Sequence, residues 1–195
     1  MSVSMLNYIE LLKALLVSLK IPKKVALHFE REESRILKEA KLVDGFYLKA
    51  IDNSKDLELS IEIRKKVFVD EQGVSSQLEN DGLDNIEKIY ANNAVVIIGY
   101  LNERPIATAR MVVYQEDKKI WKVGRVSVLK KFRGMGYGKL IMESIHRAAN
   151  DNQANQLILH AQLDVVPFYL GLSYAVDGDN FLEANIWHKK MFLKL

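Results

Sequence analysis

The stretch Arg133-Gly134-Met135-Gly136-Tyr137-Gly138 decides the fold of this chain. It follows the apolar, β-branched run 126–129 and precedes residues 140–149, in which apolar side chains recur at helical spacing. This order predicts a strand, a glycine-rich turn and the N-terminus of a helix. Unpaired N–H groups and the helix dipole at such a terminus favour an anion, and glycine lets a phosphate approach closely. Because Arg133 can add a charge-assisted contact, the stretch predicts a site for the pyrophosphate of a small molecule.

The type of this loop follows from the residues around it. A nucleoside-triphosphate loop ends in Gly-Lys-Ser/Thr, but Gly138-Lys139-Leu140 has no hydroxyl for magnesium. A dinucleotide loop has its third glycine one position later, and an acidic residue closes the next strand. The next predicted strand, 156–162, ends in glutamine. Both nucleotide-binding alternatives are therefore excluded, whereas a glycine-rich connection without a ligand stays open.

Arg133–Gly138 resembles the coenzyme A signature of the GCN5-related N-acetyltransferases (GNAT), Arg/Gln-x-x-Gly-x-Gly/Ala. Further along, this superfamily has Phe-Tyr-x-x-x-Gly-Phe, and Phe168-Tyr169 begins a similar element with a shorter spacer. The resemblance covers residues 45–195. It implies a mixed α/β, or α+β, fold: a central sheet with a splayed pair of strands, flanked by helices.

Further motifs are similar to those of a subgroup of small predicted acetyltransferases. Val67-Phe68-Val69-Asp70-Glu71-Gln72 matches Val-Phe-Val-x-Glu-Gln, and 79–84 matches the acidic pattern that follows it. Gly124-Arg125-Val126-Ser127-Val128 fits the Gly-Arg-Val-x-Val motif of that subgroup. Residues 181–188 also fit, with Trp187 where the subgroup usually has proline.

The resemblance implies a set of residues that bind acetyl-CoA as cosubstrate, without a metal. They are Val126, Ser127, Val128, Arg133, Gly134, Met135, Gly136, Tyr137, Gly138 and Lys139. The strand residues among them would meet the pantetheine arm with their main chain, where an amide can polarise the thioester carbonyl. Lys139 either contacts phosphate or is a solvated residue of the first helical turn.

Acyl transfer to an amine needs an acid for the departing thiolate and a base for the ammonium proton. Tyr169 resembles the tyrosine that protonates the coenzyme A sulfur in many members of the superfamily. Glu71 is the preferred candidate for the base, because its motif would lie on the acceptor side. The alternatives are Glu183, His188 and His160, or a base that acts through water.

Composition excludes several other kinds of site. The chain of 195 residues has a formal net charge of +3, which fits an anionic cofactor better than a nucleic-acid surface. It has no cysteine, so acyl transfer cannot pass through a cysteinyl acyl-enzyme and should be direct. Its four histidines are far apart in sequence, and this argues against a bound metal. The apolar segment 5–19 is too short for a membrane span, so we expect a soluble, cytoplasmic protein.

The chain divides into two predicted parts. Residues 1–44 have the pattern of two amphipathic helices, a helical extension for packing, for dimerisation or, least favoured, for DNA. Residues 45–195 form the predicted acetyltransferase domain. Its expected strands are 46–51, 94–101, 106–115, 120–129, 156–162 and a closing region within 183–195. Its expected helices are 57–69, the helix after the glycine loop and 165–170, with a long loop at 72–93.

Three arginines and an acidic cluster are expected to pair. They are Arg64, Arg110 and Arg125 on one side, and Glu79, Asp81 and Asp84 on the other. A structural network that holds the acidic loop over the sheet is the preferred interpretation for the arginines. For the acids, a role in recognition of the acceptor stays equally open.

These features predict an N-acetyltransferase that moves acetyl from acetyl-CoA directly to an amine of a small molecule or peptide, through a ternary complex. One alternative is an acyltransferase that resembles acyl-homoserine-lactone synthases, and another is a non-catalytic acyl-CoA-binding regulator. The acceptor is not readable from the sequence. A homodimer is plausible by resemblance, and no nucleic-acid or membrane partner is expected.

Overall fold

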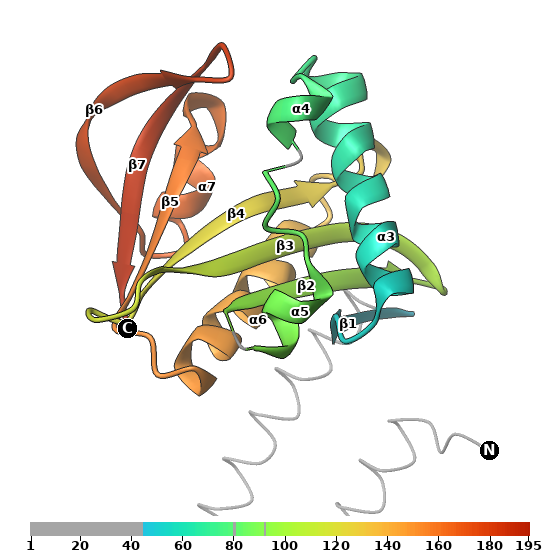
Figure 1. Ribbon diagram of the computed structural model, residues 1–195. Helices are drawn as coiled ribbons and strands as arrows, with labels where there is room; N and C mark the ends of the chain where they lie inside the picture. Colours follow the sequence, from blue (N-terminus) through green and yellow to red (C-terminus); the bar gives the residue numbers. More distant parts are fainter. Residues whose placement is uncertain (1–44, 80, 92) are drawn as a thin grey trace, which may run out of the picture. The chain divides into compact units, whose positions relative to one another are not determined.

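The computed structural model describes residues 45–79, 81–91 and 93–195. The helical extension predicted for 1–44 lies outside these residues. The described residues form a seven-stranded mixed sheet in the order β1-β2-β3-β4-β5-β7-β6 (Figure 1). The strands are β1 (Phe46–Ala50), β2 (Ala94–Leu101), β3 (Arg104–Gln115), β4 (Ile120–Val128), β5 (Gln156–Gln162), β6 (Ala175–Glu183) and β7 (Ile186–Lys194).

The strands β4 and β5 form a splayed parallel pair, as predicted. Their register begins with Ile120 opposite Gln156 and ends with Val123 opposite Leu159. Beyond that point β4 continues to Val128 without β5 beside it, and the two strands diverge in Figure 1. The other neighbouring strands of this sheet pair antiparallel.

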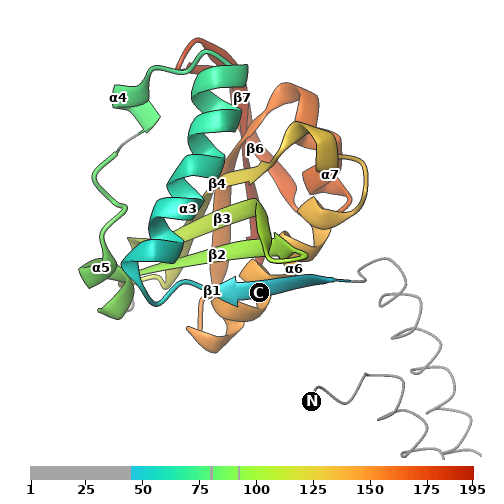
Figure 2. The same cartoon turned by 90° about the vertical axis from the view of Figure 1, so that its right-hand side faces the viewer.

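Helices cover both faces of the sheet (Figures 1 and 2). The helix α6 (Tyr137–Asp151) buries Ile141, Met142 and Ile145 against one face, in the larger core cluster. The helix α3 (Ser54–Arg64) packs on the opposite face, in a smaller cluster with residues of β2. The two faces follow from the alternation of side chains along β2, because Ile97 belongs to the first cluster whereas Val96 and Ile98 belong to the second.

The predicted helix 57–69 is longer than expected and changes its geometry. It begins at Ser54, because the side chain of Asn53 accepts a hydrogen bond from the Asp56 N–H at 2.9 Å and caps the first turn. After Arg64 it continues as the π-helix η1 (Lys65–Glu71).

The remaining helical segments are short. The predicted loop 72–93 contains α4 (Ser76–Glu79) and α5 (Ile86–Tyr90). The other short segments are η2 (Lys130–Phe132), η3 (Leu163–Val165) and α7 (Val166–Leu170).

The closing strand predicted within 183–195 is confirmed as β7, but β6, which pairs with it in a hairpin, was not predicted. Ala184 and Asn185 connect the two strands, and both have positive φ, 50° and 61°. This is the backbone of a tight two-residue hairpin turn. The strand β6 escaped prediction because most of its residues are exposed, and the register shifts between Asp177 and Asn180.

The turn yields a prediction about stability. Ala184→Gly should raise the free energy of unfolding by up to about 1 kcal/mol, because alanine is strained at φ 50° and glycine is not. Urea denaturation of the two proteins measures the difference. Ala148→Gly, inside α6, is the control and should lower stability by about 1 kcal/mol. A destabilised Ala184→Gly variant would contradict the strain assigned to this turn.

Candidate active site

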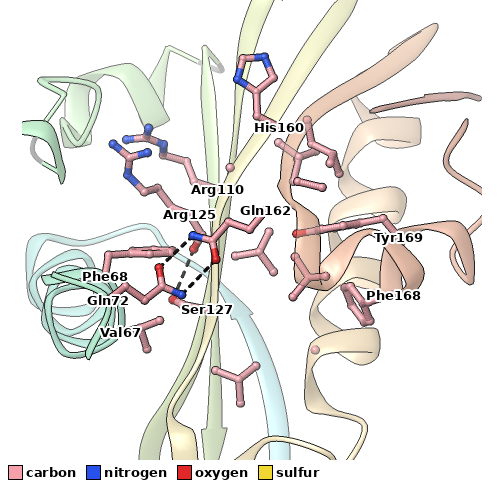
Figure 3. Close-up of a pocket in the computed structure, with 18 of the residues that line it drawn as sticks. Val67, Phe68, Gln72, Arg110, Arg125, Ser127, His160, Gln162, Phe168 and Tyr169 are labelled. Atoms are coloured by element: carbon pink, nitrogen blue, oxygen red, sulfur yellow. Dashed lines mark hydrogen bonds between the residues drawn. The ribbon is translucent and has the colours of Figure 1, made fainter. Parts of the chain in front are cut away.

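The divergence of β4 and β5 opens a cavity of about 920 Å³, within the usual size of small-molecule sites. Its wall is built from β4, β5, the end of η1, the start of α6, α7 and the hairpin β6–β7. Figure 3 shows side chains from these elements converging on it. The cavity is therefore lined both by the glycine loop and by Arg110 and Arg125.

The glycine loop carries unpaired backbone donors. Gly134 and Gly136 have φ of 76° and 86°, which favours glycine at both positions, and Gly136 caps α6. None of the N–H groups from Gly134 to Gly138 donates to another described residue. The first-turn bonds of α6 begin only with Lys139 and Leu140, whose N–H groups donate to the Gly136 carbonyl. A row of free donors at a helix N-terminus is suited to a phosphate.

Most of the residues predicted to bind the cofactor line this cavity. These are Val126, Ser127, Val128, Arg133, Gly134, Gly136, Tyr137, Gly138 and Lys139. Met135 does not line it, and its side chain is exposed. The ring of Tyr137 is buried against Phe46, so the N–H of Tyr137, rather than its ring, is the group available to a ligand.

The β4 edge that faces the cavity is irregular. Arg125 has φ 55°, and the register of β3 with β4 shifts between Thr108 and Arg110, opposite this residue. The resulting bulge lies where the pairing with β5 has already ended. On the β5 side, the main chain between Gly124 and Val128 therefore has no neighbouring strand, and these residues line the cavity.

Arg133 and Glu71 are held together, a contact that the sequence did not predict. The guanidinium donates to both carboxylate oxygens of Glu71, at 2.5 and 2.9 Å, and to the Val128 carbonyl at 2.9 Å. The hydrogen bond from Arg133 lowers the pKa of Glu71. Glu71 was the preferred candidate for the base, but it does not line the cavity. It lies beside the glycine loop, because it pairs with Arg133.

Tyr169 lines the cavity from α7. Its ring is 8% exposed and meets Phe168 and Tyr174 edge to face. Its hydroxyl has no hydrogen-bond partner among the described residues, and in Figure 3 it projects toward the centre of the cavity. Burial raises the pKa of Tyr169, so the phenol stays protonated and free to donate.

The predicted arginine–acid pairs are confirmed. Arg64, fully buried, contacts Glu79 at 2.5 Å and Asp84 at 2.6 Å. Arg110 bonds to Asp84 at 2.9 Å and to Asp81. Arg125 bonds to Asp81 at 3.1 Å and to the Glu79 carbonyl at 2.9 Å. The network fastens Glu79, Asp81 and Asp84 to α3, β3 and β4, and four of its members, Glu79, Asp81, Arg110 and Arg125, line the cavity.

Two further contacts border the cavity. The side-chain amides of Gln72 and Gln162 donate to each other, at 2.9 and 3.2 Å, and link the end of η1 to the end of β5 (Figure 3). No sequence pattern signals this pair. His160 Nδ1 lies 2.8 Å from Glu183 Oε2, so two of the alternative candidates for the base lie together.

Comparison with known protein families matches residues 70–195 to the acetyltransferase (GNAT) domain. The chain belongs to the GNAT acetyltransferase family. It is an acyltransferase by this membership, and its splayed sheet is the fold of that family. The family match begins within η1 and includes the glycine loop, the splayed strands and the closing hairpin.

Individual relatives agree with this family. A Bacillus subtilis protein, the uncharacterized N-acetyltransferase YjcF, is 34% identical over 140 residues, covering 71% of this chain and 93% of its own length. An acyl-CoA N-acyltransferase from Pseudomonas aeruginosa shares the fold with a TM-score of 0.66 and 24% identity, over 75% of this chain and 98% of that one. The PaiA N-acetyltransferase from Thermoplasma acidophilum, solved in complex with coenzyme A, has a TM-score of 0.59 and 13% identity, over 76% and 99%.

In the part of the chain that the structure describes, no helix has both the length and the hydrophobicity to cross a bilayer.

The ion-pair network yields a prediction about pH. Burial alone would raise the pKa of Asp81, but the hydrogen bond and charge of Arg110 lower it to about 2. Because the folded pKa is depressed, its stabilisation is present above about pH 4 and is lost as the pH falls toward 2. Asp81→Asn should therefore flatten the fall in unfolding free energy between pH 4 and 2, as measured by urea denaturation.

Asp117→Asn, in the exposed turn after β3, is the control and should leave the pH profile of the parent unchanged. An equally steep acid loss in Asp81→Asn would contradict the role given to its carboxylate.

Proposed function

We propose that this enzyme transfers the acetyl group of acetyl-CoA directly to an amine of a small molecule or peptide, in a ternary complex. The observation that carries the proposal is the row of unpaired N–H groups at Gly134–Gly138, which open into the same cavity as the Tyr169 hydroxyl. The N–H groups can bind a diphosphate, and the hydroxyl can donate a hydrogen bond to a sulfur. Since the chain has no cysteine, no thiol can take the acetyl group in between.

Coenzyme A would lie along the open edge of β4. The glycine loop and the α6 terminus would bind its diphosphate, and the main chain of Val126, Ser127 and Val128 would bind its pantetheine amides. A β4 amide beside the thioester would stabilise the negative charge that develops on the carbonyl oxygen.

Arg133 and Lys139 would complete the phosphate site. A guanidinium has five N–H donors, and the contacts with Glu71 and Val128 use three of those on Arg133. The two others remain for a phosphate oxygen, so Glu71 can hold Arg133 in place while Arg133 binds the ligand. The exposed ammonium of Lys139 lies 3.8 Å from Glu143, a weak surface pair that a phosphate can replace.

The proton balance defines what the side chains must do. The acceptor ammonium first loses a proton to a base, and the neutral amine attacks the thioester carbonyl. The C–S bond of the tetrahedral intermediate then breaks, the nitrogen loses its second proton, and the sulfur gains one. The products are the amide, the free thiol of coenzyme A and one proton left on the base.

Tyr169 would act at the sulfur. Its raised pKa means that full transfer to a thiolate would be unfavourable by itself, because thiols are ordinarily more acidic than phenols. Its role is then to donate a hydrogen bond as the negative charge develops, and to pass on the proton that the attacking nitrogen releases.

The assignment of Glu71 as the base stays a prediction. Its carboxylate accepts two hydrogen bonds from Arg133, which lowers its pKa and makes it a weaker proton acceptor.

Thiol release from acetyl-CoA, measured with a panel of amines and peptides, tests the proposal. Acetyl-CoA should be used in preference to longer acyl donors. A clear preference for longer donors would favour the acyl-homoserine-lactone-synthase-like alternative. Tight binding of acetyl-CoA without turnover on any amine would contradict the proposed reaction.

Tyr169→Phe should lower kcat about 100-fold with little change in the affinity for acetyl-CoA, because it removes one hydroxyl donor and keeps the ring packing. Tyr174→Phe is the matched control. That residue packs against Tyr169, but its hydroxyl bonds to His146 at 3.2 Å and does not line the cavity. A Tyr169→Phe enzyme as active as the parent would remove the acid assignment.

A further inference from the structure

His160 and Glu183 form a histidine–carboxylate pair in the cavity wall. His160 belongs to β5 and Glu183 to the end of β6, and both side chains line the cavity. His160 Nδ1 lies 2.8 Å from the Glu183 carboxylate, which can only accept a hydrogen bond. This partner favours the tautomer of the neutral ring in which Nδ1 carries the proton and Nε2 the lone pair.

The neighbours of this pair are also polar or aromatic. Lys122 on β4 approaches His160 Nδ1 at 3.4 Å, a longer contact than that of the carboxylate. Lys190 on β7 is the register partner of His160, and its ammonium is paired with Asp177 at 2.7 Å. The ring of Phe181 meets the imidazole edge to face, with the centroids 4.8 Å apart. His160 is thus held in one orientation by a carboxylate and an aromatic ring.

We propose that His160, oriented by Glu183, is the base that removes the proton from the acceptor ammonium; this inference rests on the proposed function. One N–H bond of the ammonium breaks, and a bond between that proton and Nε2 forms. The neutral amine then attacks the thioester, and the Glu183 carboxylate stabilises the imidazolium without taking the proton. Because the hydrogen bond from His160 lowers the pKa of Glu183 to about 2, that carboxylate stays ionised throughout.

The other candidates have less suitable surroundings. The Glu71 carboxylate is engaged by Arg133 and does not line the cavity. His188 does line it, but its Nδ1 lies 2.8 Å from the Ile186 carbonyl, a neutral partner that stabilises an imidazolium less than a carboxylate does. The side chain of His160 is a quarter exposed, which leaves a route for the proton to solvent, whereas His188 is buried.

The acid and the base lie where the proposed reaction needs them, one near the sulfur of the donor and the other near the amine of the acceptor. His160 follows Leu159, where the pairing of β5 with β4 ends, whereas the glycine loop follows the far end of β4 beyond Val128. Tyr169 projects into the same cavity from α7 (Figure 3). A thioester carrier anchored at the glycine loop would present its sulfur to Tyr169, and the acceptor would occupy the end where His160 lies.

The first experiment uses the full chain and the thiol-release assay. His160→Gln should lower kcat/KM for an alkyl amine at pH 7 by about 10² to 10⁴, with the affinity for coenzyme A unchanged by calorimetry. The loss should fall below about tenfold with an aromatic amine, which is already neutral at that pH and needs no base before attack. His146→Gln, a histidine outside the cavity, is the matched control and should keep the activity of the parent.

The second experiment tests the positioning role of Glu183. Glu183→Gln removes the carboxylate that orients the His160 ring, so kcat/KM should fall much more for an alkyl amine than for an aromatic amine, as in His160→Gln. A merely structural role for Glu183 would lower both values equally.

If the parent is active and the His160→Gln variant is equally active, His160 is not the base, and the proposed function is unaffected. Equal losses with alkyl and aromatic amines would also contradict His160 as the base. A parent that releases no thiol with any amine would contradict the proposed function itself.

Discussion

The structure depends on the point at which β4 and β5 stop sharing hydrogen bonds. Their parallel pairing ends at Val123 and Leu159. Beyond this point β4 continues to Val128, and no strand pairs with it on the β5 side. Buried backbone groups need partners, so an unpaired strand edge inside a protein is suited to a ligand with amides of its own. The same cavity is lined by the α6 terminus and by side chains of β5 and β7. The divergence of β4 and β5 therefore forms both the proposed cofactor-binding site and the proposed site of acyl transfer.

The open strands are held by contacts that do not fill the space between them. The arginine–acid network fixes Glu79, Asp81 and Asp84 against α3, β3 and β4, beside the bulge at Arg125. The Gln72–Gln162 amide pair connects η1 to the end of β5 across the opening. Removal of one partner from a buried ion pair such as Arg64–Glu79 leaves an uncompensated charge, so these contacts preserve the shape of the cavity better than an apolar cluster that can repack.

The sequence predicts those parts of the fold whose pattern is local. The strands β2 and β5 were predicted with their observed bounds, because each is a continuous apolar run beside turn residues. The strand β6 was missed, because it is an exposed edge with an irregular register and has no alternation to read. The start of α3 was placed too late, because the Asn53 cap precedes the apolar residues that define the pattern.

In the site, too, only the features that leave a local pattern in the sequence could be predicted. The glycine loop and Tyr169 are motifs, and the three arginines beside an acidic cluster are a charge pattern, so these could be predicted. The Glu71–Arg133 pair could not, because each residue was given a separate role and only the fold brings them together. The Gln72–Gln162 pair is 90 positions apart and leaves no pattern at all.

The central claim is that backbone donors around the start of α6 bind the diphosphate of a thioester carrier. Calorimetric titration of the same protein with 4′-phosphopantetheine and with pantetheine, which lacks only the phosphate that forms part of that diphosphate, tests it most directly. Loss of two or more charge-assisted hydrogen bonds should make pantetheine bind at least about 100-fold more weakly than 4′-phosphopantetheine. Equal affinities, or no heat with either ligand, would contradict the account.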